Sequence, residues 1–526
     1  MAGWEKTIDL RRYGASNRNW LGMTINPAVF FPIALIALSV ILFSVIAPQA
    51  SADLFSWLRA SAVSRFNWFL LTVGNLALLF CIAVAVSPLG KLRLGGAEAK
   101  PEYSYLAWFS MLFGAGMGIG LVFYGVGEPV THFTASMAGG PAAPLGGAPG
   151  DAGGARSIAM AATVYNWALH PWAIYAVVGL ALAVFSYNFH MPLSLRSPFY
   201  PLLGARVWGR TGDAIDVLAV FATLFGLASS LGLGASQAMA GITHLYGIAS
   251  SPPAIIALIA IMAFVTYLSV RGGIDKGIRI LSEVNMIVAL ALIIFVLATG
   301  ATLVLLANMF GNLAAYIQLL PAFSNLVGRI DTGFYNDWTA YYWTWWISWA
   351  PFVGLFMARI SKGRTVREFL AGALIAPTLL CVLWLTVFGD GSIAQIVAGK
   401  APELAKAPLD TQLFLFLESL PMAQITSFVS ICLILIFFIT GWDSGTLVID
   451  TMTSGGRTDT SLRQKTFWLF AVGGIAVVLL LSGGLISLQA AAIASGLPLA
   501  LVLILMCAGT LRGLLALHRD QENREK

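Results

Sequence analysis

Long apolar runs follow one another along the entire chain and are separated by short polar loops. Twelve of these runs are long enough to cross a lipid bilayer as helices. They cover residues 29–47, 66–86, 105–126, 158–186, 214–246, 253–270, 281–306, 338–357, 366–388, 413–442, 466–486 and 490–511. A membrane β-barrel would instead show short segments in which apolar and polar residues alternate. The pattern therefore predicts an all-α polytopic membrane protein with twelve transmembrane helices.

The composition excludes a soluble protein of this length. Apolar residues make up 58% of the 526 residues and charged residues only 10%, whereas a soluble domain carries about 25% charged residues to keep its surface wetted. The net charge of +6 comes from basic residues scattered over short loops, which is not the footprint of a nucleic-acid partner. The expected surroundings are membrane lipids.

The basic residues also predict the orientation in the membrane. With twelve spans, the loops on the side of the N-terminus carry 24 Lys and Arg residues, and the loops on the other side carry 6. Positively charged loops stay in the cytoplasm, so both termini are expected there. The longest outer segments are 127–157, which is rich in Gly, Pro and Ala, and 307–337, which has the residues of an amphipathic helix lying on the outer surface.

Unusual residues within a span are costly in lipid, so they point to function more often there than in soluble proteins. In the third span, every second residue from Gly114 to Gly120 is glycine, and each glycine weakens a helix by about 1 kcal/mol relative to alanine. Two interpretations are open. One is close packing of helices through small residues; the other is an unwound helix whose free carbonyl groups face a substrate or ion.

Aromatic residues gather in the fourth and eighth spans. Trp167, Trp172 and Tyr175 fall on one helical face at 100° per residue. The eighth span has five tryptophans within residues 338–349, more than an interfacial aromatic belt needs. A quaternary ammonium group has no N–H to donate, so ring faces bind it best, through cation–π attraction. The fourth-span aromatics therefore indicate either an interfacial belt or part of an aromatic box.

Polar residues also lie at the predicted end of the tenth span. Thr440, Gly441 and Asp443 lie at its predicted cytoplasmic end, where a hydroxyl and a carboxylate suit a cation. An ordinary helix C-terminus followed by a polar loop explains the same residues equally well. The chain has no GxSxG or HExxH motif, so we expect no enzyme, no catalytic residues and no cofactor.

Taken together, these motifs resemble those of a known family. The run Trp338–Trp349 resembles the signature of the betaine/carnitine/choline transporter family, and the segment Gly116–Gly120 is similar to the glycine segment of that family's third span. The three aromatic residues of the fourth span match the family as well. The resemblance extends from Asn26 to about Cys507, which is nearly the whole chain.

The resemblance implies two leading helices followed by two inverted repeats of five helices each. The expected organisation is a cytoplasmic N-terminal segment (1–28), two leading helices (29–86), a first repeat (105–306), an outer amphipathic segment (307–337), a second repeat (338–511) and a short cytoplasmic tail (512–526). It also implies a homotrimer in the bacterial plasma (inner) membrane, with the outer amphipathic segment at the subunit interface.

The resemblance further implies a secondary transporter that alternates access to a site near the bilayer midplane. By similarity, a quaternary-ammonium substrate would lie among Trp167, Trp172, Tyr175 and Trp346 and would also contact Met117. Trp345 and Trp349 would line the cytoplasmic path. A coupling sodium ion would use Gly114, Met117, Phe437, Thr440 and Gly441.

Three departures bear on substrate and coupling. Proton-coupled choline carriers of this family resemble one another in placing an aspartate where this chain has Gly120, and its absence favours the zwitterion glycine betaine. Sodium-coupled relatives often have hydroxyl residues where this chain has Leu227 and Gly441, so each change removes one oxygen from a sodium site. We expect sodium symport of glycine betaine. The alternative is a sodium-independent or proton-coupled carrier of carnitine, choline or a sulfonium analogue.

Overall fold

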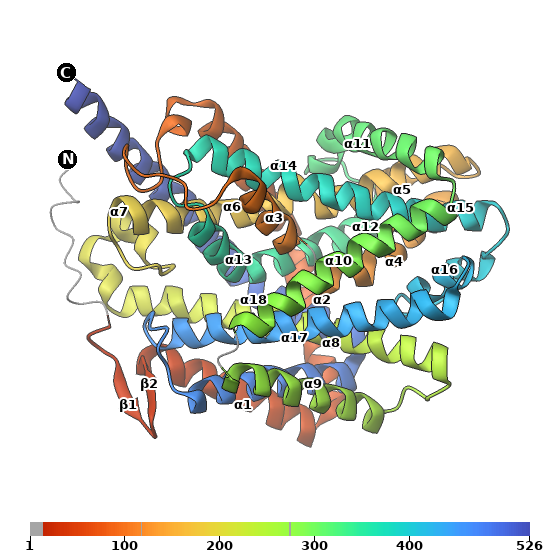
Figure 1. The fold of residues 1–526 in the computed structure, drawn as a ribbon, viewed down its shortest axis with the longest axis horizontal. Helices are drawn as coiled ribbons and strands as arrows, with labels where there is room; N and C mark the ends of the chain where they lie inside the picture. The colour runs from red at the N-terminus through yellow and green to blue at the C-terminus, as the bar shows by residue number, and fades with distance from the viewer. Residues whose placement is uncertain (1–13, 117, 273–274, 526) are drawn as a thin grey trace.

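The computed structural model describes residues 14–116, 118–272 and 275–525. Within these ranges the chain is helical nearly throughout (Figure 1). Its strands there are β1 (Arg18–Trp20) and β2 (Met23–Ile25), which pair as a short antiparallel hairpin before the first helix. The prediction of an all-α membrane protein is confirmed.

The long helices follow one another in chain order. They are α1 (Pro27–Ile46), α2 (Pro48–Val86), α4 (Ile119–Ala138), α5 (Ala152–Trp167), α6 (Leu169–Ala183), α8 (Arg210–Tyr246), α9 (Pro252–Gly272), α10 (Asp275–Thr299), α11 (Thr302–Ser324), α13 (Ala340–Ile360), α14 (Val366–Leu385), α17 (Ala423–Thr453) and α18 (Leu462–Glu525).

Shorter helices and helical turns connect them. The α-helices are α3 (Tyr105–Gly116), α7 (Tyr200–Leu203), α12 (Thr332–Phe334), α15 (Gly391–Val397) and α16 (Gln412–Glu418). The π-helical turns are η5 (Val184–Asn188), η8 (Tyr335–Thr339) and η9 (Thr386–Asp390). The 3₁₀ turns are η3 (Pro88–Lys91), η4 (Pro144–Gly146), η6 (Ser197–Phe199), η7 (Gly204–Trp208) and η10 (Pro402–Ala405).

Ten of the described helical stretches are long and apolar enough to cross a membrane. The number differs from the twelve predicted runs because runs and helices do not correspond one to one. Helix α18 contains the last two runs, joined at Gly484, whose φ of 59° breaks the regular helix. The third run is divided between α3 and α4, and the eighth, in α13, is rich in Trp and Tyr, which lowers its mean hydropathy. Helix α11, which is not one of the twelve predicted runs, is counted among the ten.

Two predicted span boundaries are wrong. Helix α10 ends at Thr299 and α11 begins at Thr302, so the run 281–306 belongs to two helices. The run 413–442 is also divided, because α16 ends at Glu418 and α17 does not begin until Ala423. Helix α17 then continues well beyond residue 442, to Thr453.

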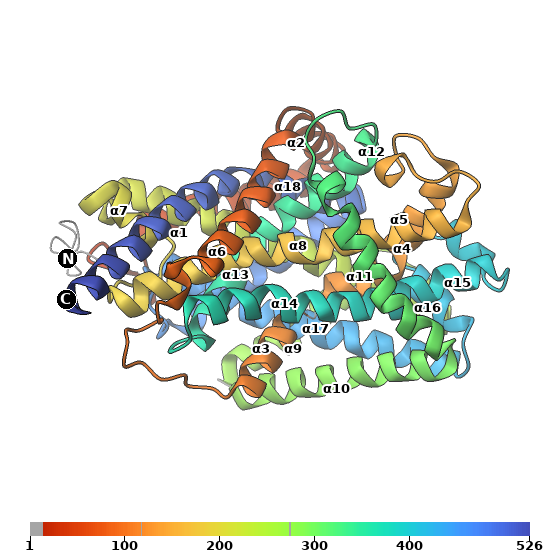
Figure 2. The same ribbon diagram turned by 90° about the horizontal axis from the view of Figure 1, so that it is seen from above.

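Helix α11 forms most of the predicted outer segment. It packs against α5 and the turn η9, and Figure 2 shows it crossing obliquely over α14 instead of following the long helices. Asn312 anchors it, because its amide donates hydrogen bonds to Thr386 Oγ1 at 3.0 Å and to Asp390 Oδ2 at 3.5 Å. Leu303 and Phe310 remain exposed on its outer side.

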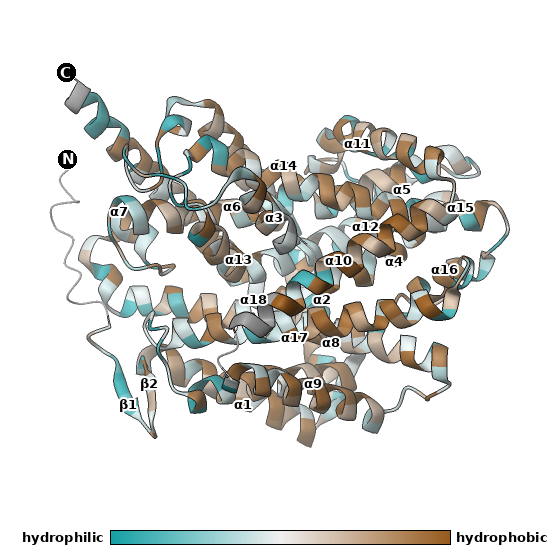
Figure 3. Cartoon of the chain, in the orientation of Figure 1, coloured by the Kyte–Doolittle hydropathy of each residue, from teal (hydrophilic) through white to brown (hydrophobic). Residues whose placement is uncertain are grey.

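The helices divide into an apolar exterior and a buried centre. In the most apolar stretch of α9 only 22% of the residues are buried, against 83% in α8 and 94% in the segment formed by α5, α6 and η5. Figure 3 shows hydrophobic colouring along the helices and hydrophilic colouring at β1 and near the C-terminal end of α18. The exposed apolar side chains of the outer helices therefore face lipid, and α5, α6 and α8 form the centre.

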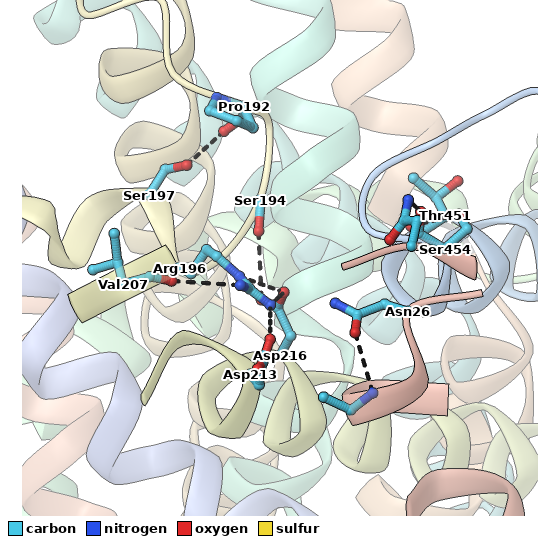
Figure 4. A network of polar contacts seen from close by, with 12 residues as sticks. Asn26, Pro192, Ser194, Arg196, Ser197, Val207, Asp213, Asp216, Thr451 and Ser454 are labelled. Carbon is cyan, nitrogen blue, oxygen red and sulfur yellow. Dashed lines mark hydrogen bonds and ion pairs between the residues drawn. The ribbon is translucent and has the colours of Figure 1, made fainter. Parts of the chain in front are cut away.

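A buried polar network closes one end of the bundle. Arg196, just before η6, donates hydrogen bonds to Asp216 at 2.8 Å and to Asp213 at 3.0 Å, both near the start of α8 (Figure 4). Burial disfavours the charged guanidinium, but the two carboxylates more than offset this, so the pKa of Arg196 is raised above its ordinary value. Figure 1 places α7, which follows this loop, at the same end as β1 and the C-terminal end of α18.

Candidate functional site

The third span is interrupted where the sequence has its alternating glycines. Helix α3 ends at Gly116, α4 begins at Ile119, and Gly118 between them has an extended backbone (φ −164°, ψ 176°). Met117 lies outside the described residues. An interrupted helix frees carbonyl groups from internal hydrogen bonds, as the interpretation of an unwound helix requires.

The contacts of Gly120 agree with the other interpretation, in which small residues let neighbouring elements pack closely. A Cβ at this position would lie 2.4 Å from Cη2 of Trp345 and 3.1 Å from Cη2 of Trp167. Any side chain here would therefore displace a tryptophan. The unwound-helix interpretation therefore applies at Gly118, and the close-packing interpretation applies at Gly120.

The four residues predicted for the aromatic box come together from three helices. Trp167 is the last residue of α5, Trp172 and Tyr175 lie in the first two turns of α6, and Trp346 lies in α13. Helices α5 and α6 are separated at Ala168, whose backbone leaves the helical region (φ −97°, ψ −124°). The prediction that Trp167, Trp172 and Tyr175 share one helical face is therefore wrong, because this break lies between Trp167 and Trp172.

The rings of these four residues form a chain of nearly perpendicular contacts. The ring centroids of Trp167 and Trp346 are 4.9 Å apart at 77°, those of Trp346 and Tyr175 are 6.0 Å apart at 88°, and those of Tyr175 and Trp172 are 5.4 Å apart at 83°. Trp346 is half-buried and the other three are buried. Perpendicular rings form adjacent walls, so their faces can surround a cation that makes no hydrogen bond.

The two tryptophans predicted for the cytoplasmic path share one hydroxyl group. The indole N–H groups of Trp345 and Trp349 both donate to Ser230 Oγ in α8, at 3.2 and 3.0 Å. Trp345 also stacks on Trp346, with ring centroids 5.1 Å apart at 23°. These residues therefore extend the box towards α8. The part played by Ser230 was missed from the sequence, although a hydroxyl within a buried helix was a signal for it.

A buried carboxylate lies beside the box and was also missed from the sequence. Helix α4 continues to Ala138, so Glu128 is not in an outer loop, as a span ending at residue 126 implied, but inside a helix and fully buried. Its carboxylate accepts hydrogen bonds from Asn166 Nδ2 and Trp167 Nε1, both at 2.7 Å, and from Tyr342 OH at 2.5 Å. A lone carboxylate among apolar residues was the signal for it.

The polar group of the tenth span lies within α17 and not at its end. The predicted helix end is wrong, because α17 continues past Asp443, whose carboxylate accepts a hydrogen bond from Ser269 of α9 at 2.8 Å. Thr440 Oγ1 donates to the carbonyl of Ile436 at 2.9 Å, which leaves lone pairs on the hydroxyl oxygen for an ion. A Cβ on Gly441 would meet no other atom within 4 Å.

The start of α4 approaches this segment across α8. Ile119 and Phe438 both lie against Gly234, where a Cβ would be 3.1 Å from each of the two side chains. Phe437, the neighbour of Phe438, is half-buried. Gly114, at the other side of the break, lies beside Met286 of α10. The assignment of these residues to a sodium site stays a prediction.

Comparison with known proteins places the chain among transporters. The sequence profile described as BCCT, betaine/carnitine/choline family transporter, matches residues 28–519. The chain is 46% identical over 505 residues to a glycine betaine/proline/choline transporter of Vibrio parahaemolyticus, covering 94% of this chain and 91% of that protein. It is 44% identical to a glycine betaine/proline/choline/ectoine transporter of the same species, covering 97% and 91%. It is 38% identical to a glycine betaine transporter of Acinetobacter baylyi, covering 93% and 73%.

Proposed function

Since the chain belongs to the betaine/carnitine/choline transporter family, we propose that it is a secondary active transporter that imports a quaternary-ammonium zwitterion, with glycine betaine as the first candidate. The resemblance noted in the sequence is confirmed, and the relatives are transporters and not enzymes. The observation that carries the proposal is the set of perpendicular rings formed by Trp167, Trp346, Tyr175 and Trp172 in the buried centre. Such a set fits a trimethylammonium group.

Two facts support glycine betaine as the substrate. Gly120 supplies no carboxylate to pair with a cationic substrate, and the close approach of Trp345 and Trp167 leaves no space for a longer residue there. The names of the relatives also include glycine betaine, in each of the three cases above. Carnitine, choline and sulfonium analogues have the same ring-face chemistry and remain the alternatives.

Sodium symport is the proposed coupling. The interrupted helix between Gly116 and Ile119 provides free carbonyl groups, and Thr440 provides a hydroxyl oxygen on α17. Oxygen is the ligand that a hard cation requires. Sodium-independent exchange and proton coupling are the alternatives, because Leu227 and Gly441 offer no hydroxyl group.

The proposed transport cycle moves one helix bundle against another around the box, with two inverted repeats as the moving parts. We place the protein in the bacterial plasma membrane as a homotrimer, with α11 at the subunit interface and both termini in the cytoplasm. The common position of β1 and the C-terminal end of α18 at one end of the bundle supports the same-side placement of the termini (Figure 1).

One experiment tests the function. The purified full-length protein is reconstituted into liposomes and offered radiolabelled glycine betaine, choline, carnitine and a sulfonium analogue, with and without an inward sodium gradient. We expect accumulation of glycine betaine above the external concentration only with the gradient. Uptake of none of the four compounds would contradict the proposed transport. Equilibration without accumulation would contradict sodium symport and would indicate a channel or a carrier that does not use the sodium gradient.

A further inference from the structure

Glu128 has a buried carboxylate that is surrounded by hydrogen-bond partners. It is fully buried in α4, and three of its partners, Asn166, Trp167 and Tyr342, donate hydrogen bonds to it. The fourth, His132, lies with Nε2 3.2 Å from Oε1. An ionised carboxylate only accepts hydrogen bonds, so this set of donors is the one that a negative charge requires.

These hydrogen bonds hold the walls of the box. Trp167 and Tyr342 both donate to the same oxygen, Oε2. The ring of Trp167 meets Trp346 edge-on, and the ring of Tyr342 stacks on Trp346 with centroids 5.9 Å apart at 18°. Glu128 therefore fixes two of the rings that pack against Trp346.

The other carboxylate oxygen acts on Trp346 through a third residue. Oε1 accepts a hydrogen bond from the side chain of Asn166, and the backbone carbonyl of Asn166 accepts the indole N–H of Trp346 at 2.9 Å. Trp346 is thus oriented by the residue that Glu128 holds in place. One carboxylate determines the positions of Trp167, Tyr342 and Trp346.

The charge of Glu128 also affects the affinity of the rings for ligands of different charge. A hydrogen bond from an indole N–H to a carboxylate shifts electron density into the ring, and cation–π attraction rises with the negative charge on the ring face. The carboxylate is fully buried, so water screens its field only weakly. The field favours a positive group at the box and disfavours a second negative group on the same substrate.

We infer that Glu128 is a positioning residue that sets the charge preference of the box. It orients and polarises the rings, and its charge contributes more to the binding of a net cation such as choline than to the binding of a zwitterion such as glycine betaine. The inference rests on the proposed function. Since Gly120 supplies no carboxylate to the substrate, Glu128 is the buried negative charge that a cationic substrate would experience through Trp167.

The test compares two ligands on the full-length protein. Glu128→Gln removes the charge and keeps the shape, and Glu128→Asp keeps the charge. Dissociation constants for choline and glycine betaine are measured by tryptophan fluorescence titration. We expect Glu128→Gln to weaken choline binding more than betaine binding, so that the ratio of the two constants changes by about threefold or more. We expect Glu128→Asp to weaken both without changing their ratio.

The possible outcomes separate this inference from the proposed function. An equal loss for both ligands in Glu128→Gln would show a structural role only and would overturn the inference, as would no loss. A wild-type protein that binds neither ligand would instead contradict the proposed function. If Glu128→Gln does not fold, Trp167→Phe gives a second route, because it keeps a ring but removes the N–H that meets the carboxylate. It should shift the ratio in the same direction, and an unchanged ratio would overturn the inference.

Discussion

The indole of Trp346 stands edge-on to the indole of Trp167, with their ring centroids 4.9 Å apart and their planes at 77°. Trp167 ends α5, in the first predicted repeat, and Trp346 lies in α13, in the second. A substrate that packs against both rings would touch the two proposed repeats at once. Any movement of one repeat against the other would therefore change the box itself, which is what alternating access requires.

Removal of either of two box tryptophans should weaken substrate binding. Trp346→Leu and Trp172→Leu keep apolar bulk but remove the ring face that attracts a cation, which is worth about 2 kcal/mol or more when desolvated. We expect more than a tenfold loss of affinity with normal assembly, as measured by tryptophan fluorescence titration and size-exclusion chromatography. Wild-type affinity in both variants would reject the box.

Removal of the Ser230 hydroxyl, which Trp345 and Trp349 share, should slow transport. Ser230→Ala leaves the indole N–H groups of Trp345 and Trp349 without their common acceptor, and an unpaired buried donor costs about 1–3 kcal/mol. We expect a slower initial rate of uptake in liposomes. Ser229→Ala is the matched control, because the neighbouring hydroxyl donates to the carbonyl groups of Phe225 and Leu488 and touches neither tryptophan through a hydrogen bond. Equal effects of the two variants would contradict the role of Ser230.

The helices were largely predictable from the sequence, because apolar runs must form helices in lipid. The arrangement of the aromatic residues was predictable only in part: Trp172 and Tyr175 share helix α6, but the break at Ala168 places Trp167 in α5. The sequence held a signal for Glu128, a lone carboxylate among apolar residues, but its partners were not predictable, because only the folded chain brings the donors of α5 and α13 near it. The residues after position 126 are of types typical of a loop, but as far as Ala138 they belong to helix α4.

The end of the tenth span was mispredicted for a related reason. Thr440, Gly441 and Asp443 resemble the end of a helix, since polar residues are expensive in lipid. The folded chain satisfies them: Thr440 donates to its own helix and Asp443 accepts from Ser269. Tertiary partners therefore allow α17 to continue where composition predicts that it should stop.

The network around Arg196 predicts an effect on stability. Arg196→Met leaves Asp216 buried without its cation, and breaking a buried pair on one side costs about 3–5 kcal/mol. We expect a clear fall in the melting temperature of the detergent-solubilised protein, and a smaller one for Arg196→Lys. Arg457→Met is the control, because its ion pair with Asp459 is exposed and should contribute nothing measurable. A melting temperature unchanged in Arg196→Met would contradict the structural role.

The coupling ion gives the most demanding prediction. Gly441 offers a backbone carbonyl but no hydroxyl, and one missing oxygen ligand should weaken sodium binding by about 1–3 kcal/mol. A Cβ at Gly441 meets no atom within 4 Å, so Gly441→Ser adds a hydroxyl without a clash. We expect it to lower the sodium concentration for half-maximal uptake. Thr440→Ala should raise that concentration or abolish uptake.

The control for this prediction lies on the same helix. Thr451 donates from its hydroxyl to the carbonyl of Leu447 at 2.8 Å, the same local bond that Thr440 makes with Ile436. Thr451→Ala therefore removes an equivalent hydroxyl at a distance from the proposed ion and should leave the sodium dependence unchanged. If wild-type uptake proceeds equally well in sodium-free potassium buffer, the proposal of sodium symport is wrong. Counterflow into liposomes preloaded with substrate would then separate an exchanger from a proton-coupled carrier, because only the exchanger depends on internal substrate.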